Sequence, residues 1–354
     1  MQHTGLSAAT RTRCVLALCA ALLAGCSRSE QRSGGENAGG LETLKLRYQI
    51  MAGQVQPAEL AESLGYLAPL ELSNVGSTIS GPQNVQAVVT NDADFGGAFN
   101  GAVINLIAGK APIRAFVGYY GVDDLRLTSF FTLSGSPIQS ARDLIGKKIA
   151  VNTLGAHSEF MIKEYMSRAG LSAEDVRQVT LIVMPPVNTE LALRQGQIDV
   201  AALYDIFRDR ALERGGLQTL FTDYDLFGTF TAGSYVLRND FVRDNEKTTR
   251  HFITGVARAI EWARTTAREE VVARFEKIMT ERGANEDPSV SRYWKSFGVA
   301  GKGGVIADRE FQIWLDWMVK DGSLKPGQLS RADLYDNAFN PFASEAGASA
   351  AQQP

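Results

Sequence analysis

The sequence predicts an α/β fold made of two similar lobes that are joined by two strands. Three observations lead to this prediction. Short strand patterns alternate with helix patterns from Leu44 onward, one pattern recurs in both halves, and two β-rich stretches connect the halves. The 354 residues are enough to bury one or two hydrophobic cores.

The first elements follow from the spacing of apolar residues. Residues 44–50 alternate between apolar and polar side chains, which predicts a strand. A helix that begins with proline is expected at 57–65, and the next strand at 70–75. Ser80 is placed to cap a further helix, in which Pro82 lies in the first turn, where the missing N–H costs little.

An internal repeat is the most informative local feature. Residues 91–100 and residues 196–205 each end a helix, form a short strand and enter another helix. The strands that precede them, 46–50 and 148–152, also correspond. The gap-free alignment pairs Asp94 with Asp199, Phe99 with Tyr204, and Asn100 with Asp205. Two matched elements in the same order indicate two similar lobes.

The β-rich stretches 126–133 and 229–237 are the expected hinge strands, because they connect the two halves if the second is inserted into the first. On this interpretation, lobe 1 comprises residues 44–132 and 236–340, and lobe 2 comprises residues 133–235.

The chain after the second hinge strand is expected to be helical near residues 240–267, 269–282, 288–297 and 308–320. Phe275 and Met279 fit a packed helical face, so we interpret them as core residues. Residues 341–354 are rich in Ala, Ser and Gln, and we expect a disordered tail there.

The N-terminus has the pattern of an export signal. Residues 1–25 carry two arginines, no acidic residue and a ten-residue apolar run, which suits a signal peptide but is too short to span a bilayer. The sequence Leu-Ala-Gly-Cys that ends at Cys26 looks like a bacterial lipobox, so lipid on Cys26 is expected to anchor an exported protein to the cell envelope. The alternative is an ordinary secretory signal with a chance cysteine. Residues 26–43 are polar and predict a flexible tether.

Composition and motifs exclude several classes of function. The net charge of −3 becomes −5 once the two arginines of the signal are removed, and no basic block follows, so nucleic acid is not expected as a partner. No cysteine follows Cys26, which excludes disulfides and a cysteine nucleophile. The sequence also lacks the serine-hydrolase elbow, the zinc-protease helix and the nucleotide-binding glycine motifs. We therefore expect no enzyme activity, no metal and no cofactor.

Polar residues at predicted strand ends suit the binding of a small molecule, because ligands of open α/β sheets lie beyond the carboxyl ends of the strands. The candidate binding residues are Gln49, Gln54, Ser80, Asn100, Asn152, Thr153, His157, Asn188, Tyr204 and Asp205. Residues 151–158 read as a strand end, a turn and a helix start, where free N–H groups attract anions. The alternative is that the polar residues there are ordinary helix caps.

Two of these residues do not decide whether the ligand is an anion. His157 could hydrogen-bond an acidic group or could be a surface histidine. Asp205 would repel an anion unless it is paired or faces a donor.

Several phrases of the sequence resemble the substrate-binding proteins of bacterial ABC importers, most closely those for nitrate, sulfonates, taurine and pyrimidine precursors of thiamine. They lie at residues 57–65, 94–100, 104–109, 140–152, 192–200 and 240–241. In such proteins a phrase similar to Asp-Leu-Ile-Gly-Lys-Lys, at residues 143–148, opens the second lobe. The resemblance covers roughly residues 44–340.

This resemblance implies a type-II periplasmic-binding-protein fold, with a ligand cleft between the lobes that closes by hinge motion. It also implies docking on a membrane permease whose ATPase drives import. Carried over by position, the pocket would use Gln49, Gln54, Ser80, Asn100, Asn152, Thr153, His157 and Tyr204. Pyrimidine-synthase relatives of this fold carry a cysteine-rich active-site segment, and the absence of cysteine here argues against that activity.

The expected ligand is a small organic or inorganic anion. An uncharged or heteroaromatic ligand, such as a pyrimidine or a vitamin precursor, is the alternative. A lipid-anchored sensor or adaptor, or an enzyme without a recognisable motif, remains the alternative of another class.

Overall fold

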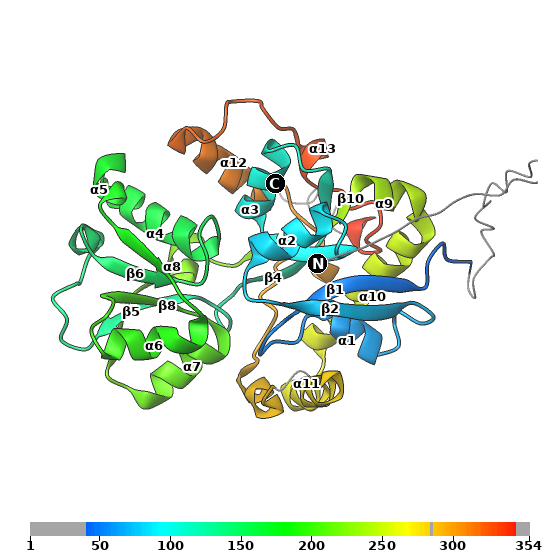
Figure 1. Ribbon diagram of the computed structural model, residues 1–354, viewed down its shortest axis with the longest axis horizontal. Coiled ribbons are helices and arrows are strands. Elements are labelled where there is room, and N and C mark those ends of the chain that lie inside the picture. Colours follow the sequence, from blue (N-terminus) through cyan, green and yellow to red (C-terminus); the bar gives the residue numbers. More distant parts are fainter. Residues whose placement is uncertain (1–39, 284–285, 345–354) are drawn as a thin grey trace, which may run out of the picture. The chain divides into compact units, whose positions relative to one another are not determined.

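Two sets of strands organise the computed structural model, which describes residues 40–283 and 286–344. Lobe 1 contains β1 (Lys45–Met51), β2 (Glu71–Thr78), β3 (Phe95–Phe99), β4 (Ile113–Val122) and β10 (Phe230–Arg238). Lobe 2 contains β5 (Ser129–Leu133), β6 (Lys148–Val151), β7 (Thr180–Val183), β8 (Val200–Leu203) and β9 (Leu217–Thr222). Figure 1 shows the lobe 2 strands in green.

The strand order is alike in the two lobes. In lobe 1, β1 pairs with β2, and a second sheet has the order β3-β10-β4. In lobe 2, a single sheet has the order β7-β6-β8-β5-β9. In both lobes the strand that arrives from the other half, β10 or β5, is inserted antiparallel beside its neighbours.

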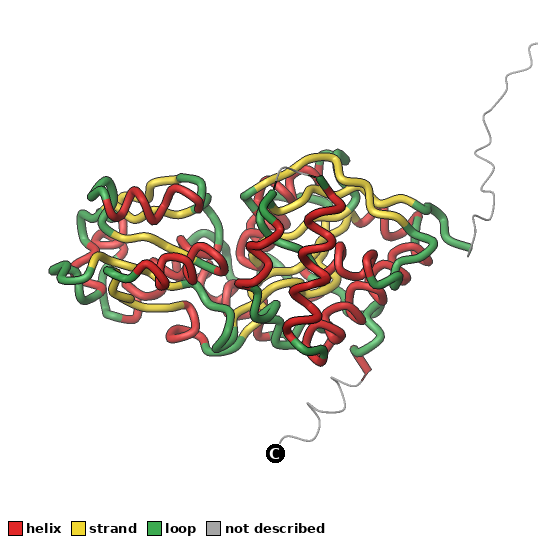
Figure 2. The backbone as a smooth tube through the Cα atoms, turned by 90° about the horizontal axis from the view of Figure 1, so that it is seen from below, coloured by secondary structure: helices red, strands yellow, loops and turns green. Residues whose placement is uncertain are grey.

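Helices pack beside the strands of both lobes, as Figure 2 shows in red and yellow. Those of lobe 1 are α1 (Pro57–Ser63), α2 (Gly81–Val89), α3 (Asn100–Ala108), α9 (Asn239–Asp244), α10 (Glu246–Thr265), α11 (Arg268–Arg282), α12 (Arg309–Asp321), α13 (Arg331–Leu334) and the 3₁₀ turns η2 (Pro288–Tyr293) and η3 (Lys302–Gly304). Those of lobe 2 are η1 (Ala141–Leu144), α4 (His157–Arg168), α5 (Ala173–Arg177), α6 (Pro186–Arg194), α7 (Asp205–Arg214) and α8 (Asp223–Phe227). Among these helices, none is both long and apolar enough to cross a bilayer.

Local signals account for the early elements. The first turn of α1 has a proline and a capping box, in which Glu59 accepts a hydrogen bond from the Gln56 backbone N–H at 2.9 Å. The hydroxyl of Ser80 caps α2 by accepting from the backbone N–H of Gln83, as expected.

The internal repeat is confirmed at the level of single hydrogen bonds. Asp94, just before β3, accepts from the backbone N–H of Arg47 on β1 at 2.7 Å. Asp199, just before β8, accepts from the backbone N–H of Lys148 on β6 at 2.8 Å. The two aligned aspartates therefore perform the same task in the two lobes, which is to tie the third strand of each repeat to the first.

The crossings between the lobes lie slightly earlier in the chain than expected. Residues 129–133 pair entirely within the lobe 2 sheet, and residues 230–238 pair entirely with β3 and β4. The connections are therefore residues 123–128 and the segment from α8 to the start of β10. The strands of lobe 2 accordingly lie within residues 129–222, and the expected lobe 2 range of 133–235 is wrong at both ends. Alternating apolar patterns locate a strand but do not reveal which sheet it joins.

The ends of the folded region also differ from expectation. Leu41 is buried, and Glu42 accepts from the backbone N–H of Thr248 at 2.8 Å, so folded structure begins before the tether was expected to end. At the other end, the ring of Phe342 lies 5.2 Å from the ammonium of Lys302. Residues 1–39, which include the signal and Cys26, and residues 345–354 lie outside the described residues.

Two expected helices are altered. The helix expected at 240–267 is divided by Asn245, where φ is −136°. The helix expected at 288–297 is a 3₁₀ turn that ends at Tyr293, after which the chain is extended at Trp294.

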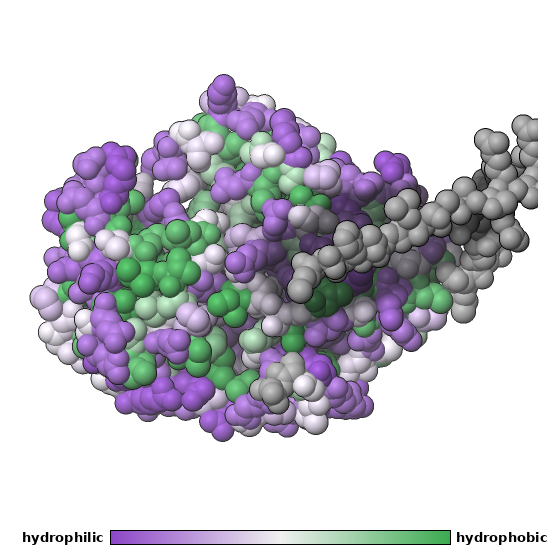
Figure 3. All heavy atoms as spheres, in the orientation of Figure 1, coloured by the Kyte–Doolittle hydropathy of each residue, from purple (hydrophilic) through white to green (hydrophobic). Residues whose placement is uncertain are grey.

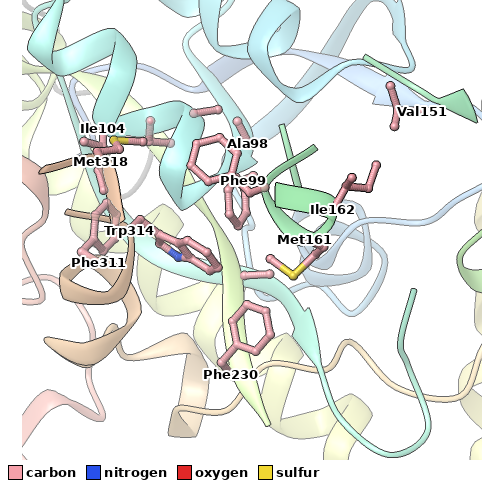
Figure 4. Packing of buried hydrophobic residues seen from close by; sticks show 14 of the residues in the cluster. Ala98, Phe99, Ile104, Val151, Met161, Ile162, Phe230, Phe311, Trp314 and Met318 are labelled. Atoms are coloured by element: carbon pink, nitrogen blue, oxygen red, sulfur yellow. The ribbon is translucent and has the colours of Figure 1, made fainter. Parts of the chain in front are cut away.

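An aromatic cluster connects the two lobes. Phe99 at the end of β3 lies 5.1 Å from Phe160 of α4 and 4.7 Å from Trp314 of α12, measured between ring centroids. Phe160 and Trp314 are 5.9 Å apart, and all three are buried. Figure 4 shows Phe99, Trp314, Phe230 and Met161 gathered around the same space. The hydrophobic core therefore continues from one lobe into the other.

The surface seen in Figure 3 is mostly hydrophilic, with apolar residues gathered on the lobe 2 side of the view. Exposed aliphatic side chains of lobe 2 include Val183, Val187 and Leu191.

Candidate functional site

A pocket lies between the two lobes, and we call it the cleft pocket. Lobe 1 lines it with Met51, Gln54, Gly81, Pro82, Ala98, Phe99, Tyr119 and Tyr120, and lobe 2 with Asn152, Ala156, His157, Ser158, Tyr204 and Asp205. The remaining lining residues are Gly121 and Val122 at the end of β4, Arg126, Leu127 and Thr128 of the first crossing, and Asp223 at the second. Because both lobes supply walls, the pocket exists only while they are together.

The N-terminus of α4 opens onto this pocket. β6 ends at Val151, and Gly155 has a φ of +67° in the turn that follows. The N-cap residue is Ala156, which is extended and has no side-chain group to cap the helix. The first N–H groups of α4 are therefore left without a side-chain cap, and such groups attract anions.

The polar residues of this turn bond to lobe 1 instead. The Asn152 side chain donates to the backbone carbonyl of Ile79 at 3.0 Å, and the Ser80 hydroxyl donates to the Thr153 hydroxyl at 3.2 Å. The proposal that they cap α4 is therefore wrong for Asn152 and Thr153. Their bonds join the lobes, and of the two residues only Asn152 lines the cleft pocket.

His157 is held by a buried carboxylate. Its Nε2 lies 2.9 Å from Oδ2 of Asp223, whose side chain has no exposed surface, and Oδ1 of Asp223 accepts from the backbone N–H of Thr128. The imidazole ring also lies 5.1 Å from the ring of Phe99. Of the two readings of His157, the surface histidine does not fit, since only 13% of its side chain is exposed.

Asp205 lies at the centre of a polar bridge between the lobes. Its Oδ2 accepts from Nη2 of Arg126 at 2.7 Å and from Nε2 of Gln54 at 3.3 Å. Arg126 also donates to the carbonyl of Gly121 at 2.7 Å, and its guanidinium lies 5.2 Å from the ring centroid of Tyr120. The negative charge that would repel an anion is thus paired with Arg126.

The backbone of Asp205 has a φ of +46°, which is unusual for a residue other than glycine. Aspartate and asparagine tolerate this left-handed region better than most residues. The conformation places Asp205 as the first residue of α7, directly after Tyr204.

Five expected site residues do not line the cleft pocket: Ser80 and Thr153, whose hydroxyls bond to each other, and Asn100, Gln49 and Asn188. Asn100 is fully buried, and its side chain bonds to the carbonyls of Thr231 and Glu310 and to the hydroxyl of Ser234. The expectation that it faces Asp205 across the cleft is therefore wrong, because α3 begins beneath α12 and β10. The side-chain oxygen of Gln49 accepts from Asn84 at 3.2 Å, and Asn188 is exposed on α6, so neither belongs to the lining of the cleft pocket.

Several lining residues were not among the expected ones. Tyr119 and Tyr120 lie near the end of β4, Arg126 lies in the crossing that follows, and Asp223 comes directly after β9. Burial raises the pKa of both tyrosines, so their hydroxyls stay neutral and can donate hydrogen bonds. A position close to a strand end identified the expected binding residues. The same criterion, used for the strands next to the crossings, would also have identified these four residues.

Metal binding has no support among residues 40–283 and 286–344, because no group of three or more histidine, cysteine or acidic side chains there is arranged to hold an ion. The ionisable side chains of the cleft pocket contact each other, since Arg126 forms an ion pair with Asp205 and His157 lies within hydrogen-bond distance of Asp223.

Comparison with known proteins agrees with this architecture. A protein of Escherichia coli (strain K12) that is named for binding aliphatic sulfonates is 28% identical over 205 residues, which are 56% of this chain and only 60% of that protein's length. The alkanesulfonate-binding protein of Xanthomonas axonopodis pv. citri, solved with bound MOPS, has a similar structure with a TM-score of 0.65 at 18% identity, covering 84% of this chain and 99% of its own. The periplasmic nitrate-binding protein of Synechocystis PCC 6803 has a TM-score of 0.63 at 14% identity, covering 89% of this chain and 90% of its own.

The structural similarities confirm the two-lobed periplasmic-binding-protein fold that the sequence predicts. The family follows from a separate match that spans most of both lobes, from Pro57 in α1 to Glu269 in α11. Since residues 57–269 match it, this chain belongs to the NMT1/THI5-like family.

Proposed function

We propose that this chain is the solute-binding component of an ABC importer, and that it captures a small organic anion in the cleft pocket as the lobes close. A permease and its ATPase would then take up the solute. The family, the fold and the relatives named for binding sulfonates and nitrate support this function. They also favour a binding protein over an enzyme.

The observation that carries the proposal is the open N-terminus of α4. Its N–H groups have no side-chain cap, and the start of α2, at Gly81 and Pro82, lies at the same pocket from the opposite lobe. Two helix N-termini that converge on one pocket favour negative charge there. Because Arg126 and His157 already have carboxylate partners, backbone N–H groups are the main support for an acidic head group.

The remaining lining suits an organic body better than an inorganic ion. The rings of Phe99, Tyr119 and Tyr120 line the cleft pocket and offer apolar surface to an organic group. We therefore favour organic sulfonates and carboxylates.

A second candidate is an uncharged heteroaromatic ligand. The same three rings could stack on a heterocycle, and the paired charges of the pocket leave no excess of positive side chains to require an anion.

The cellular setting is also proposed. Export and a lipid anchor on Cys26 follow from the sequence pattern at the N-terminus, and together they would hold the protein at the outer face of a membrane, beside the permease.

Calorimetric titration tests the ligand class with four probes: ethanesulfonate, benzenesulfonate, nitrate and the uncharged pyrimidine cytosine. We expect benzenesulfonate to bind most tightly. Ala156→Leu should weaken its binding by about tenfold or more, because a larger side chain at the N-cap blocks the helix N-terminus. Ala169→Leu, at the exposed C-cap of the same helix, is the matched control. If only cytosine binds tightly, the ligand is the uncharged heteroaromatic candidate and not an anion. If Ala156→Leu leaves the affinity for benzenesulfonate unchanged, α4 does not belong to the site.

A further inference from the structure

A second pocket lies beside the cleft pocket, and we call it the adjoining pocket. The two pockets share six lining residues, which therefore form the wall between them: Gln54, Tyr119, Tyr120, Arg126, Leu127 and Asp205.

Of the two contacts that Asp205 makes within this wall, one is weaker than the other. Arg126 and Asp205 form an ion pair at 2.7 Å, whereas Gln54 is joined to Asp205 by a longer, weaker hydrogen bond of 3.3 Å. Gln54 lies in the loop between β1 and α1, and its side chain is neutral. The Gln54 side chain can therefore move away from Asp205 without breaking the ion pair.

The far side of the adjoining pocket is apolar and aromatic. Phe275 and Met279 of α11, Val290 of η2, and Trp294 and Phe297 after η2 line it. The ring of Trp294 lies 5.3 Å from that of Phe275 and 5.7 Å from that of Phe297. These residues form a surface suited to an aliphatic or aromatic group.

Each charged residue in the lining has a partner of opposite charge, although the three cations outnumber the two carboxylates. Besides Arg126 and Asp205, the charged residues are Arg208, Asp209 and Lys295, and Asp209 pairs with both Arg208 and Lys295 at 2.7 Å. The apolar far side, and not these paired charges, makes the adjoining pocket suited to an apolar group.

Closure of the lobes encloses the adjoining pocket too. Lys295 of lobe 1 pairs with Asp209 of α7 in lobe 2, and the Tyr293 hydroxyl donates to Glu213 of the same helix at 3.0 Å. A ligand group in the adjoining pocket would thus be enclosed by the same motion as a head group in the cleft pocket.

We propose that the adjoining pocket receives the apolar tail of a ligand whose acidic head lies in the cleft pocket, with the tail passing Gln54. The solute class is then an organic acid with an extended aliphatic or aromatic tail. This inference rests on the proposed function, because it places the head group at α4.

Titration with ethanesulfonate, hexanesulfonate and decanesulfonate tests the tail directly. Affinity should rise about fourfold for each methylene that enters the adjoining pocket. Val290→Trp should fill that pocket, so we expect decanesulfonate to lose affinity by about thirtyfold while ethanesulfonate binds as before. Val187→Trp, the same substitution at an exposed site of α6, should change neither value.

Unchanged ethanesulfonate binding also reports that the variant is folded, and Leu125→Trp, at a half-exposed position in the same lining, gives a second obstruction. Equal affinities for the three sulfonates, or decanesulfonate binding that neither variant weakens, would overturn the tail pocket and leave the proposed function intact. Absence of binding by all three would overturn the inference together with the anion-binding function.

Discussion

Asp205→Asn should weaken the fold and strengthen anion binding at the same time. Asparagine keeps the shape of the side chain and tolerates the φ of +46°. The substitution removes only the negative charge that pairs with Arg126. The guanidinium would keep its hydrogen bond to the Gly121 carbonyl and its contact with the Tyr120 ring.

The cost in stability follows from burial. Removing one partner of a fully buried ion pair costs about 3–5 kcal/mol. Here 18% of the Arg126 side chain and 19% of the Asp205 side chain are exposed, and the asparagine oxygen still accepts a hydrogen bond. We therefore expect the free energy of unfolding to fall by about 1–2 kcal/mol.

The gain in affinity follows from Coulomb's law. Arg126 and Asp205 both line the cleft pocket, so their charges largely cancel for a ligand there. Once Asp205 is neutral, a head group about 6 Å from the guanidinium gains roughly 2–3 kcal/mol at an effective dielectric constant of about 20. Anion affinity should then increase by about thirtyfold to a hundredfold.

Urea denaturation and calorimetric titration with benzenesulfonate measure the two effects on the same samples. Asp209→Asn is the matched control, because Asp209 lines only the adjoining pocket and should not change the affinity for this short probe as strongly. If Asp205→Asn instead lowers anion affinity, the carboxylate contributes to binding or to closure, and charge cancellation is the wrong description of this bridge.

Asn100→Ala should lower the free energy of unfolding by about 3 kcal/mol, because three buried hydrogen bonds are lost, and should leave ligand affinity unchanged. Loss of affinity without loss of stability would show that Asn100 belongs to the binding site. Burial raises the pKa of Glu310 from 4.5 to about 7, so its contribution to stability is complete below about pH 4.5 and is lost as the pH rises through about 7. Glu310→Gln should accordingly remove up to about 3 kcal/mol of pH-dependence from denaturation curves between these values, and a parallel curve would contradict this. Cys26→Ala should move the protein from the membrane fraction to the soluble exported fraction, whereas unchanged membrane association would exclude the lipid anchor.

The sequence predicts the fold well where the hydrogen bonds of a residue depend on its own strand or turn. The repeat alone pairs Asp94 with Asp199, and each of them bonds to the first strand of its own lobe. The Ser80 cap and the turn before His157 are equally local, since a few neighbouring residues determine them.

The same repeat misleads at Asn100. Its alignment with Asp205 is correct as topology, because both residues begin the helix after the third strand of the repeat. Their surroundings differ, since Asn100 is covered by Glu310 of α12, which comes from a region 210 residues later in the chain. Lobe 2 has no counterpart of α12. An alignment of the two repeated halves therefore cannot show that α12 covers Asn100.

The adjoining pocket could not be predicted for a related reason. Phe275 and Met279 do pack in the core as expected, and they also line this pocket once the chain from Val290 onward folds against them. Helical periodicity identifies the buried face of α11, but it does not distinguish a residue that contacts only protein from one that borders a cavity.

The aromatic cluster of Phe99, Phe160 and Trp314 has a consequence for how the protein unfolds. A hinged protein with two lobes could melt in two steps, one for each lobe, if few contacts crossed between them. Here the cluster belongs to a core shared by both lobes, so neither can lose its packing without exposing buried rings of the other. Thermal unfolding should therefore be one cooperative transition, in which the calorimetric and van't Hoff enthalpies agree.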